Sequence, residues 1–114
     1  MELEKIRDEL RQFAAEREWD QFHSPKNLAT ALAIEAAELL EHFQWLTDAE
    51  SRNLEAARRE EVVLEMADVF LYLIRLADKL DANLLEAAQR KLVINATKYP
   101  VSLSKGSAKK YTDL

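Results

Sequence analysis

The chain has 114 residues, a formal net charge of −5 and no cysteine. This length fits one domain over residues 1–114, and an apolar share of 48% is enough for a small hydrophobic core. The lack of cysteine excludes a disulfide framework. The net negative charge argues against a nucleic-acid partner, because a polyanion is repelled unless basic residues are concentrated in one patch.

The sequence offers no membrane segment. No stretch reaches the roughly 18 uninterrupted apolar residues that a membrane helix needs. The first ten residues, MELEKIRDEL, are charged and do not resemble a signal peptide. We therefore expect no membrane association and a cytoplasmic location.

The first half of the chain predicts two helices. One covers about residues 2–17 and places four apolar side chains on one face: Leu3, Ile6, Leu10 and Phe13. The next begins at Ser24-Pro25, a hydroxyl cap followed by proline in the first turn, and runs to about Trp45.

The second half predicts two more helices, and no segment predicts a strand. Thr47 and Glu50 have the spacing of a capping box, which opens a helical region leading into a long apolar helix that ends near Leu80. The fourth helix extends to about Lys98, before proline stops it, and residues 101–114 are expected to form an extended tail. The expected fold class is an all-α four-helix bundle.

Glu35 and Glu38 lie on a face of the second helix that otherwise reads as core. At about 100° per residue, Glu35 falls roughly 20° from the line through Leu28 and Leu46, in the middle of the apolar stripe. Glu38 lies at the edge of the stripe, roughly 60° from Glu35. Both carboxylates should therefore point toward the helix against which this one packs.

Glu65 and Asp68 form a similar pair in the long apolar helix, whose sequence from residue 62 reads VVLEMADVFLYLIRLA. A helix that is apolar on nearly all sides is covered by other helices. Its charged residues Glu65, Asp68 and Arg75 share a sector of roughly 80° with Tyr72. One polar window therefore interrupts this helix.

Four carboxylates in an apolar interior predict a cation site. Burial and mutual repulsion would otherwise raise their pKa values. Paired oxygen ligands without cysteine favour Mg²⁺, with Mn²⁺ as the alternative.

The order Glu-x-x-Glu followed by Glu-x-x-Asp on the next helix resembles the MazG-type all-α nucleotide pyrophosphohydrolases. The segments EREWDQFHSPKNLA, EAAELLEHFQW, EMADVFLYL, KLVIN, KYP and KGSAKKYTDL are similar to the dCTP pyrophosphatase branch of that family. Together they span nearly the whole chain. One departure is Leu10, where this branch can carry a histidine near the base.

The resemblance implies hydrolysis of a nucleoside triphosphate between the α and β phosphates, with dCTP or a related dNTP as substrate, in house-cleaning of the nucleotide pool. It implies that four carboxylates bind the metal: Glu35, Glu38, Glu65 and Asp68. Trp19 and Trp45 would line a base pocket, with Tyr72 facing the nucleotide. Glu38 is the candidate that also orients or deprotonates the attacking water.

The fourth helix offers candidate cations for the phosphates. Lys91, Asn95 and Lys98 follow one another at spacings of four and three, which places them on one helical face. Lysines near a helix C-terminus also serve the helix dipole and solubility, so both interpretations stay open.

The apolar third helix also predicts self-association. Four helices of one subunit can hardly cover all its sides, so we expect a homo-oligomer that completes the bundle. The family resemblance implies a dimer or a tetramer.

Two other functions compete with the hydrolase. A di-iron carboxylate bundle would need Glu-x-x-His motifs, and the sequence has none. A non-catalytic interaction module would instead pair the buried acids with Arg75 and lysines in salt bridges.

Overall fold

The computed structural model describes residues 2–114, and within them it contains helices and turns but no strand. The predicted all-α class is therefore confirmed. The chain divides into two compact units, an N-terminal unit that ends at Asp81 and a C-terminal unit, Ala82–Leu114. Within residues 2–114, no helix is both long and apolar enough to cross a membrane.

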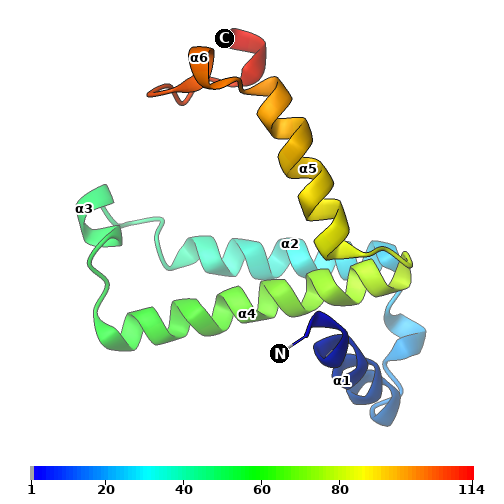
Figure 1. Cartoon of the computed structure of the whole chain (residues 1–114). Helices are drawn as coiled ribbons and strands as arrows, with labels where there is room; N and C mark the ends of the chain where they lie inside the picture. Colours follow the sequence, from blue (N-terminus) through cyan, green and yellow to red (C-terminus); the bar gives the residue numbers. More distant parts are fainter. Residues whose placement is uncertain (1) are drawn as a thin grey trace. The chain divides into compact units, whose positions relative to one another are not determined.

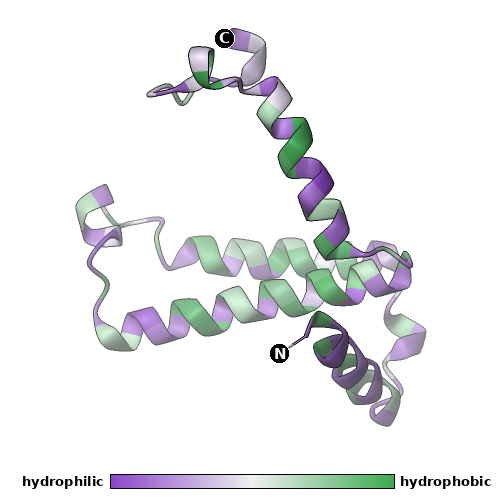
Figure 2. Ribbon diagram, viewed as in Figure 1, coloured by the Kyte–Doolittle hydropathy of each residue, from purple (hydrophilic) through white to green (hydrophobic). Residues whose placement is uncertain are grey.

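The N-terminal unit is built on an antiparallel pair of helices, α2 (Pro25–Glu41) and α4 (Ala56–Lys79), which make its most extensive contact (Figure 1). Hydrophobic residues recur along both helices (Figure 2). Leu28 of α2 and Ile74 of α4 are almost completely buried. Burial of such side chains contributes about 1.5–3 kcal/mol each, which holds the two helices together.

The start of α2 follows the sequence prediction, but its end does not. Ser24 caps the helix by accepting a hydrogen bond from the backbone of Asn27, with proline in the first turn. The helix was expected to reach Trp45, yet it ends at Glu41. Beyond it, the N–H groups of residues 42 and 43 donate to carbonyls three residues earlier, and residues 42–45 form a turn. Apolar spacing continued past the helix end, so periodicity alone gave the wrong boundary.

The predicted capping box is present at Thr47 and Glu50. The Glu50 N–H donates to Thr47 Oγ1 at 3.1 Å, and the Thr47 N–H donates to Glu50 Oε1 at 2.9 Å. It opens only a single turn, α3 (Asp48–Ser51), which residues 52–55 separate from α4. The connection between α2 and α4 is therefore a capped turn.

Helix α1 (Leu3–Glu16) packs against α4 and ends in a Schellman motif. Glu18 adopts φ 55°, and its N–H donates to the carbonyl of Ala15. The next N–H, that of Trp19, donates to the carbonyl of Ala14 at 2.9 Å. The motif fixes where the chain leaves α1 and enters the short 3₁₀ helix η1 (Asp20–Phe22).

The C-terminal unit consists of α5 (Leu84–Lys98), the single turn α6 (Val101–Ser104) and the 3₁₀ turn η2 (Tyr111–Asp113). Residues 101–114 therefore contain two helical turns, where an extended tail was expected. The N–H of Tyr111 donates to Tyr99 Oη at 3.2 Å, and the two rings meet edge to face. These contacts hold the tail against the end of α5, and spacing along the sequence does not reveal them.

Replacing Glu18 with glycine should stabilise the protein. A left-handed conformation costs a non-glycine residue roughly 1–2 kcal/mol, part of which the greater freedom of glycine in the unfolded chain offsets. We expect Glu18→Gly to raise the free energy of unfolding by about 0.5–1 kcal/mol, measured by urea denaturation. Glu18→Ala removes the same charge without relieving the backbone, so an equal gain from alanine would contradict this explanation.

Candidate functional site

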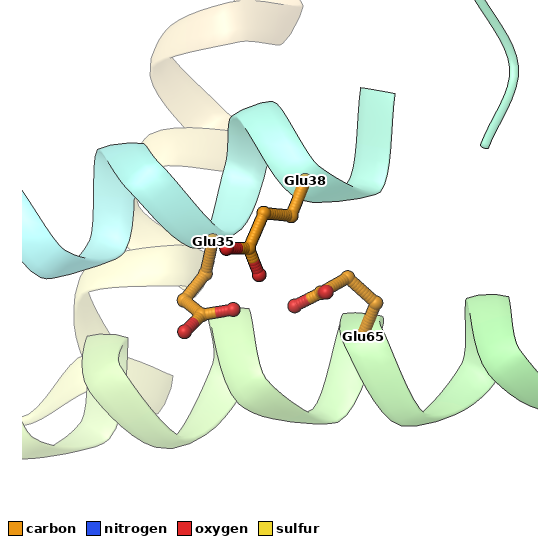
Figure 3. Close-up of side chains that lie close together, drawn as sticks. All are labelled: Glu35, Glu38 and Glu65. Atoms are coloured by element: carbon orange, nitrogen blue, oxygen red, sulfur yellow. The ribbon is translucent and has the colours of Figure 1, made fainter. Parts of the chain in front are cut away.

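Three of the four predicted metal ligands lie together between α2 and α4. Glu35 and Glu38 come from α2 and Glu65 from α4, and their carboxylates point toward one another (Figure 3). One carboxylate oxygen from each residue lies within 4.8 Å of the others. The spacing of three residues puts the two α2 side chains on one face, and antiparallel packing brings Glu65 opposite them.

Among the described residues of the N-terminal unit, no cation compensates these carboxylates. Glu35 Oε2 and Glu65 Oε2 are buried and have no hydrogen-bond partner. Within residues 2–81, no lysine or arginine forms a salt bridge with Glu35, Glu38 or Glu65. A buried oxygen without a partner is costly, so the cluster is incomplete as a set of protein groups alone.

The pKa values reflect this crowding. The carboxylate of Glu65, followed by burial, raises the pKa of Glu35 above its usual value. The pKa of Glu38 is raised chiefly by Glu35. Both shifts arise because like charges close together favour the protonated form. A bound cation would remove that preference.

The donor set fits a hard divalent cation. Glu35 and Glu65 each contribute a buried oxygen without a partner, and the exposed Glu38 adds a third carboxylate, so the cluster offers the oxygen ligands that Mg²⁺ and Mn²⁺ take in proteins. Glu35, Glu38 and Glu65 would hold such an ion. Asp68, predicted as the fourth ligand, is not part of this three-residue cluster, although its charge contributes to the raised pKa of Glu35.

Asp68 instead lines a cavity of about 450 Å³ between α1, the segment around η1, and α4. This volume lies within the range of small-molecule sites. From α4, Asp68, Tyr72 and Arg75 reach the cavity at spacings of four and three, which places the predicted polar window on its wall. The remaining lining is mostly apolar: Ile6, Glu9, Leu10, Phe13, Ala14, Trp19, His23 and Leu71.

The two tryptophans have different positions. Trp19 lines the cavity at the end of the Schellman motif, where its ring meets Phe13 edge to face at 5.7 Å. Trp45 lies in the turn after α2, is 86% exposed, and does not line this cavity. Trp19 and Tyr72 are therefore brought together in the N-terminal unit, whereas Trp45 stands apart from them.

The predicted phosphate contacts belong to the other unit. Lys91, Asn95 and Lys98 all lie on α5, in the C-terminal unit. The Lys98 ammonium lies 4.6 Å from the ring centroid of Tyr111. Their contact with phosphate stays a prediction.

The sequence interpretation missed the polar groups around Arg75. His23 was given no functional role, yet it lines the cavity. Asp20 was not singled out, yet it accepts hydrogen bonds from both Arg75 and Lys79. One signal was available, because an arginine in an apolar helix needs an acidic partner, and Asp20 begins the adjacent loop.

The same contacts weigh against the interaction-module alternative. That alternative pairs the buried acids with Arg75, but Arg75 forms ion pairs with Asp20 and Asp78. Asp78 is also bound by Arg11 of α1, which lowers its pKa. Within residues 2–81, the glutamates between α2 and α4 therefore lack the basic partner that a structural salt bridge requires.

A model of the MazG-like family matches residues 30–114. The chain belongs to the MazG-like family. Among curated proteins it is 47% identical to dCTP pyrophosphatase 1 from Rattus norvegicus and 45% identical to dCTP pyrophosphatase 1 from Homo sapiens. Each match covers 98% of this chain and 67% of the relative.

A solved structure supports the same assignment. The crystal structure of a pyrophosphatase from Archaeoglobus fulgidus matches this MazG-like chain with a TM-score of 0.81 and 45% sequence identity. The match covers 85% of this chain and 91% of the other. The family resemblance read from the sequence is therefore confirmed, and both acidic pairs lie within the residues that the family model matches.

Divalent cations should stabilise the protein in a pH-dependent way. Raised pKa values for Glu35 and Glu38, against a usual 4.5, mean that the folded state favours their protonated forms. That stability is complete below the usual pKa and is lost as pH rises through the raised values. Mg²⁺ replaces the protons. A Mg²⁺ concentration of 100 times the Kd at pH 7.5 should raise Tm at that pH by on the order of 10 °C. The same concentration should raise Tm much less near pH 4.5.

The test variant combines Glu35→Gln with Glu65→Gln and should abolish the Tm shift. The matched control is Glu60→Gln. Glu60 is exposed on α4 and lies outside the cluster, so its substitution should leave the shift intact. A shift of equal size at both pH values, measured by differential scanning fluorimetry, would contradict the proposed ligands.

Proposed function

We propose that this chain hydrolyses nucleoside triphosphates between the α and β phosphates, releasing a monophosphate and pyrophosphate. The substrate is dCTP or a related deoxynucleoside triphosphate, and the role is to clear or balance the nucleotide pool. The observation that carries the proposal is the uncompensated carboxylate cluster of Glu35, Glu38 and Glu65 near an apolar cavity. The mammalian relatives named dCTP pyrophosphatase 1 supply the substrate class. A triphosphate substrate also favours a cytoplasmic location.

The cofactor proposed for the cluster is Mg²⁺, with Mn²⁺ as a substitute. Such a cation neutralises charge that develops on the phosphate oxygens and makes water a better nucleophile near neutral pH. Asp68 joins the three glutamates as a ligand in this proposal. It lies one turn after Glu65 on α4 and also lines the cavity, so it stands where the cluster and the cavity approach each other.

The protein side chains divide the remaining work. Trp19 and Tyr72 offer aromatic faces to the base within a largely apolar cavity. Any nucleobase can stack on such a face. Trp45, which lies outside this cavity, is also proposed to contact the base. Glu38 takes the proton of the attacking water as the bridge between the α and β phosphates breaks.

Product analysis tests the reaction. The purified protein with Mg²⁺ and each common dNTP should release the monophosphate and pyrophosphate in equal amounts, identified by ion-exchange chromatography. Glu38→Gln keeps the side-chain size but cannot take a proton, so kcat should fall by about 10²-fold or more.

Glu60→Gln, which changes an exposed acid on the same unit, should keep wild-type kcat. Release of diphosphate and phosphate would exclude a pyrophosphohydrolase. Unchanged turnover by Glu38→Gln would remove that residue from the mechanism.

The proposal includes self-association through the N-terminal unit. Large apolar side chains are exposed on its two main helices and in the turn between them: Ile34, Leu40, Trp45, Val63, Leu64, Met66 and Phe70. Exposed apolar side chains in this number are typical of a surface that another chain covers. Since the family resemblance implies a dimer or tetramer, the proposed occupant is a second copy of this chain.

The oligomer can be tested by light scattering coupled to size exclusion. The wild-type protein should have the mass of a dimer or a tetramer of the 13.1 kDa chain. Met66 is 54% exposed on α4, so Met66→Glu should leave the subunit folded but place a charge in the proposed interface. Its mass should move toward that of one chain. A monomeric wild type at micromolar concentration would contradict the proposal.

A further inference from the structure

Arg75 is a buried charged residue on the wall of the cavity, and its guanidinium group contacts three other residues. Nη2 donates to Asp20 Oδ1 at 2.6 Å, and Nε donates to His23 Nδ1 at 3.2 Å. Nη1 lies 3.6 Å from Asp78 Oδ2 on the same helix. Arg75 therefore ties the loop that follows α1 to α4.

The contact with His23 determines where that imidazole carries its proton. Arginine stays protonated in proteins and only donates, so the Nδ1 that receives its hydrogen bond must be an unprotonated acceptor. An imidazolium has hydrogens on both nitrogens and is excluded by this contact. The contact therefore fits a neutral His23 with its proton on Nε2.

The charges around His23 act in the same direction. Burial, followed by the positive charges of Arg75 and Lys79, lowers the pKa of His23. The acidic group facing it, Asp20, opposes this shift but is itself held by both cations through one oxygen. The neutral form is thus favoured by the surroundings as well as by the hydrogen bond.

His23 also lines the cavity, with its ring edge to face against Trp19 at a centroid distance of 6.5 Å. None of the side-chain hydrogen bonds formed within residues 2–81 uses its Nε2. The neutral imidazole therefore has one N–H donor available beside the aromatic wall where a base is proposed to bind.

We propose that Arg75 is a positioning residue that fixes His23 in its Nε2-protonated form, and that this N–H donates to a ring or carbonyl acceptor of the pyrimidine base. The inference rests on the proposed function and adds to it a specificity-determining group. Cytosine offers such acceptors at O2 and N3, whereas thymine and uracil offer them at O2 and O4. A donor in an apolar cavity rejects ligands that leave it without an acceptor, which is how a site selects one base edge.

Asp20 gives the same arrangement a second consequence. It directly follows Trp19 in the chain and accepts hydrogen bonds from Arg75 and from Lys79 Nζ at 2.5 Å. Charge-assisted bonds of this kind are short and directional. The arginine thus fixes the loop that carries both Trp19 and His23.

Long-range ¹H–¹⁵N NMR spectra of the intact protein test the tautomer. The chain has two histidines, so the spectrum of His23→Gln assigns the signals. We expect the Nε2-protonated pattern for His23 in the wild type, and its loss in Arg75→Lys, which keeps a cation for Asp20 but lacks the Nε–H donor. An imidazolium or Nδ1-protonated pattern in the wild type would overturn the inference.

Ligand titration in the same spectra tests the contact with the base. Addition of dCMP should shift the His23 Nε2 signal, whereas deoxyribose 5-phosphate, which has no base, should leave it in place. Absence of a dCMP-dependent shift overturns the contact. This readout needs no turnover, so it is separate from the test of the hydrolase.

Kinetics compare two substitutions of His23 with the most active dNTP. His23→Leu should raise KM by about 10–100-fold with little change in kcat, because the lost contact is to a part of the substrate that does not react. His23→Gln keeps an N–H near the ε position and should recover most of the loss. With the abasic deoxyribose triphosphate, the three proteins should behave alike.

The outcomes separate this inference from the proposed function. A wild-type protein that releases no pyrophosphate from any dNTP overturns the hydrolase, while the NMR experiments still decide the tautomer and the contact. Normal turnover with an unchanged KM in His23→Leu overturns the contact alone. Circular dichroism of each variant establishes that it folds.

Discussion

The constraint that shapes the candidate site is a set of three carboxylates that face one another between α2 and α4 and have no basic partner within residues 2–81. In a structure that stabilised itself with protein groups alone, such oxygens would be hydrogen-bonded or paired. The same unit does pair its buried arginine, because Arg75 forms ion pairs with Asp20 and Asp78. Because pairing is available nearby and is not used at the cluster, the glutamates are explained by a ligand and not by the stability of the helical pair.

The cavity provides a second surface for a ligand besides the cluster. Its wall is built from α1, the loop that follows the Schellman motif, and the face of α4 that carries Asp68, Tyr72 and Arg75. The cluster is acidic and suits a cation, whereas the cavity is mostly apolar and aromatic and suits a base. A metal-bound triphosphate joined to a nucleoside has this division of chemistry within one molecule. The family match and the pyrophosphatase relatives agree with such a substrate.

Local signals in the sequence predicted local structure well and boundaries less well. The Ser24 cap and the Thr47 capping box form as expected, since each needs only groups a few residues apart. The end of α2 was misplaced because apolar spacing carries on through a turn that no longer has helical hydrogen bonds. The tail was misjudged for a related reason, since the contact between Tyr99 and Tyr111 depends on how the chain folds back.

By itself, the sequence determined the all-helical class, the family, and the placement of both acidic pairs on apolar faces, because helical periodicity fixes which residues share a face. Only the tertiary structure decided which of those residues meet. It brought Glu65 to Glu35 and Glu38, put Asp68 on the cavity wall, left Trp45 apart, and joined His23 to Arg75 across 52 residues. The register of α2 against α4 and the path of the loop after α1 set those meetings, and neither is encoded in spacing along one helix.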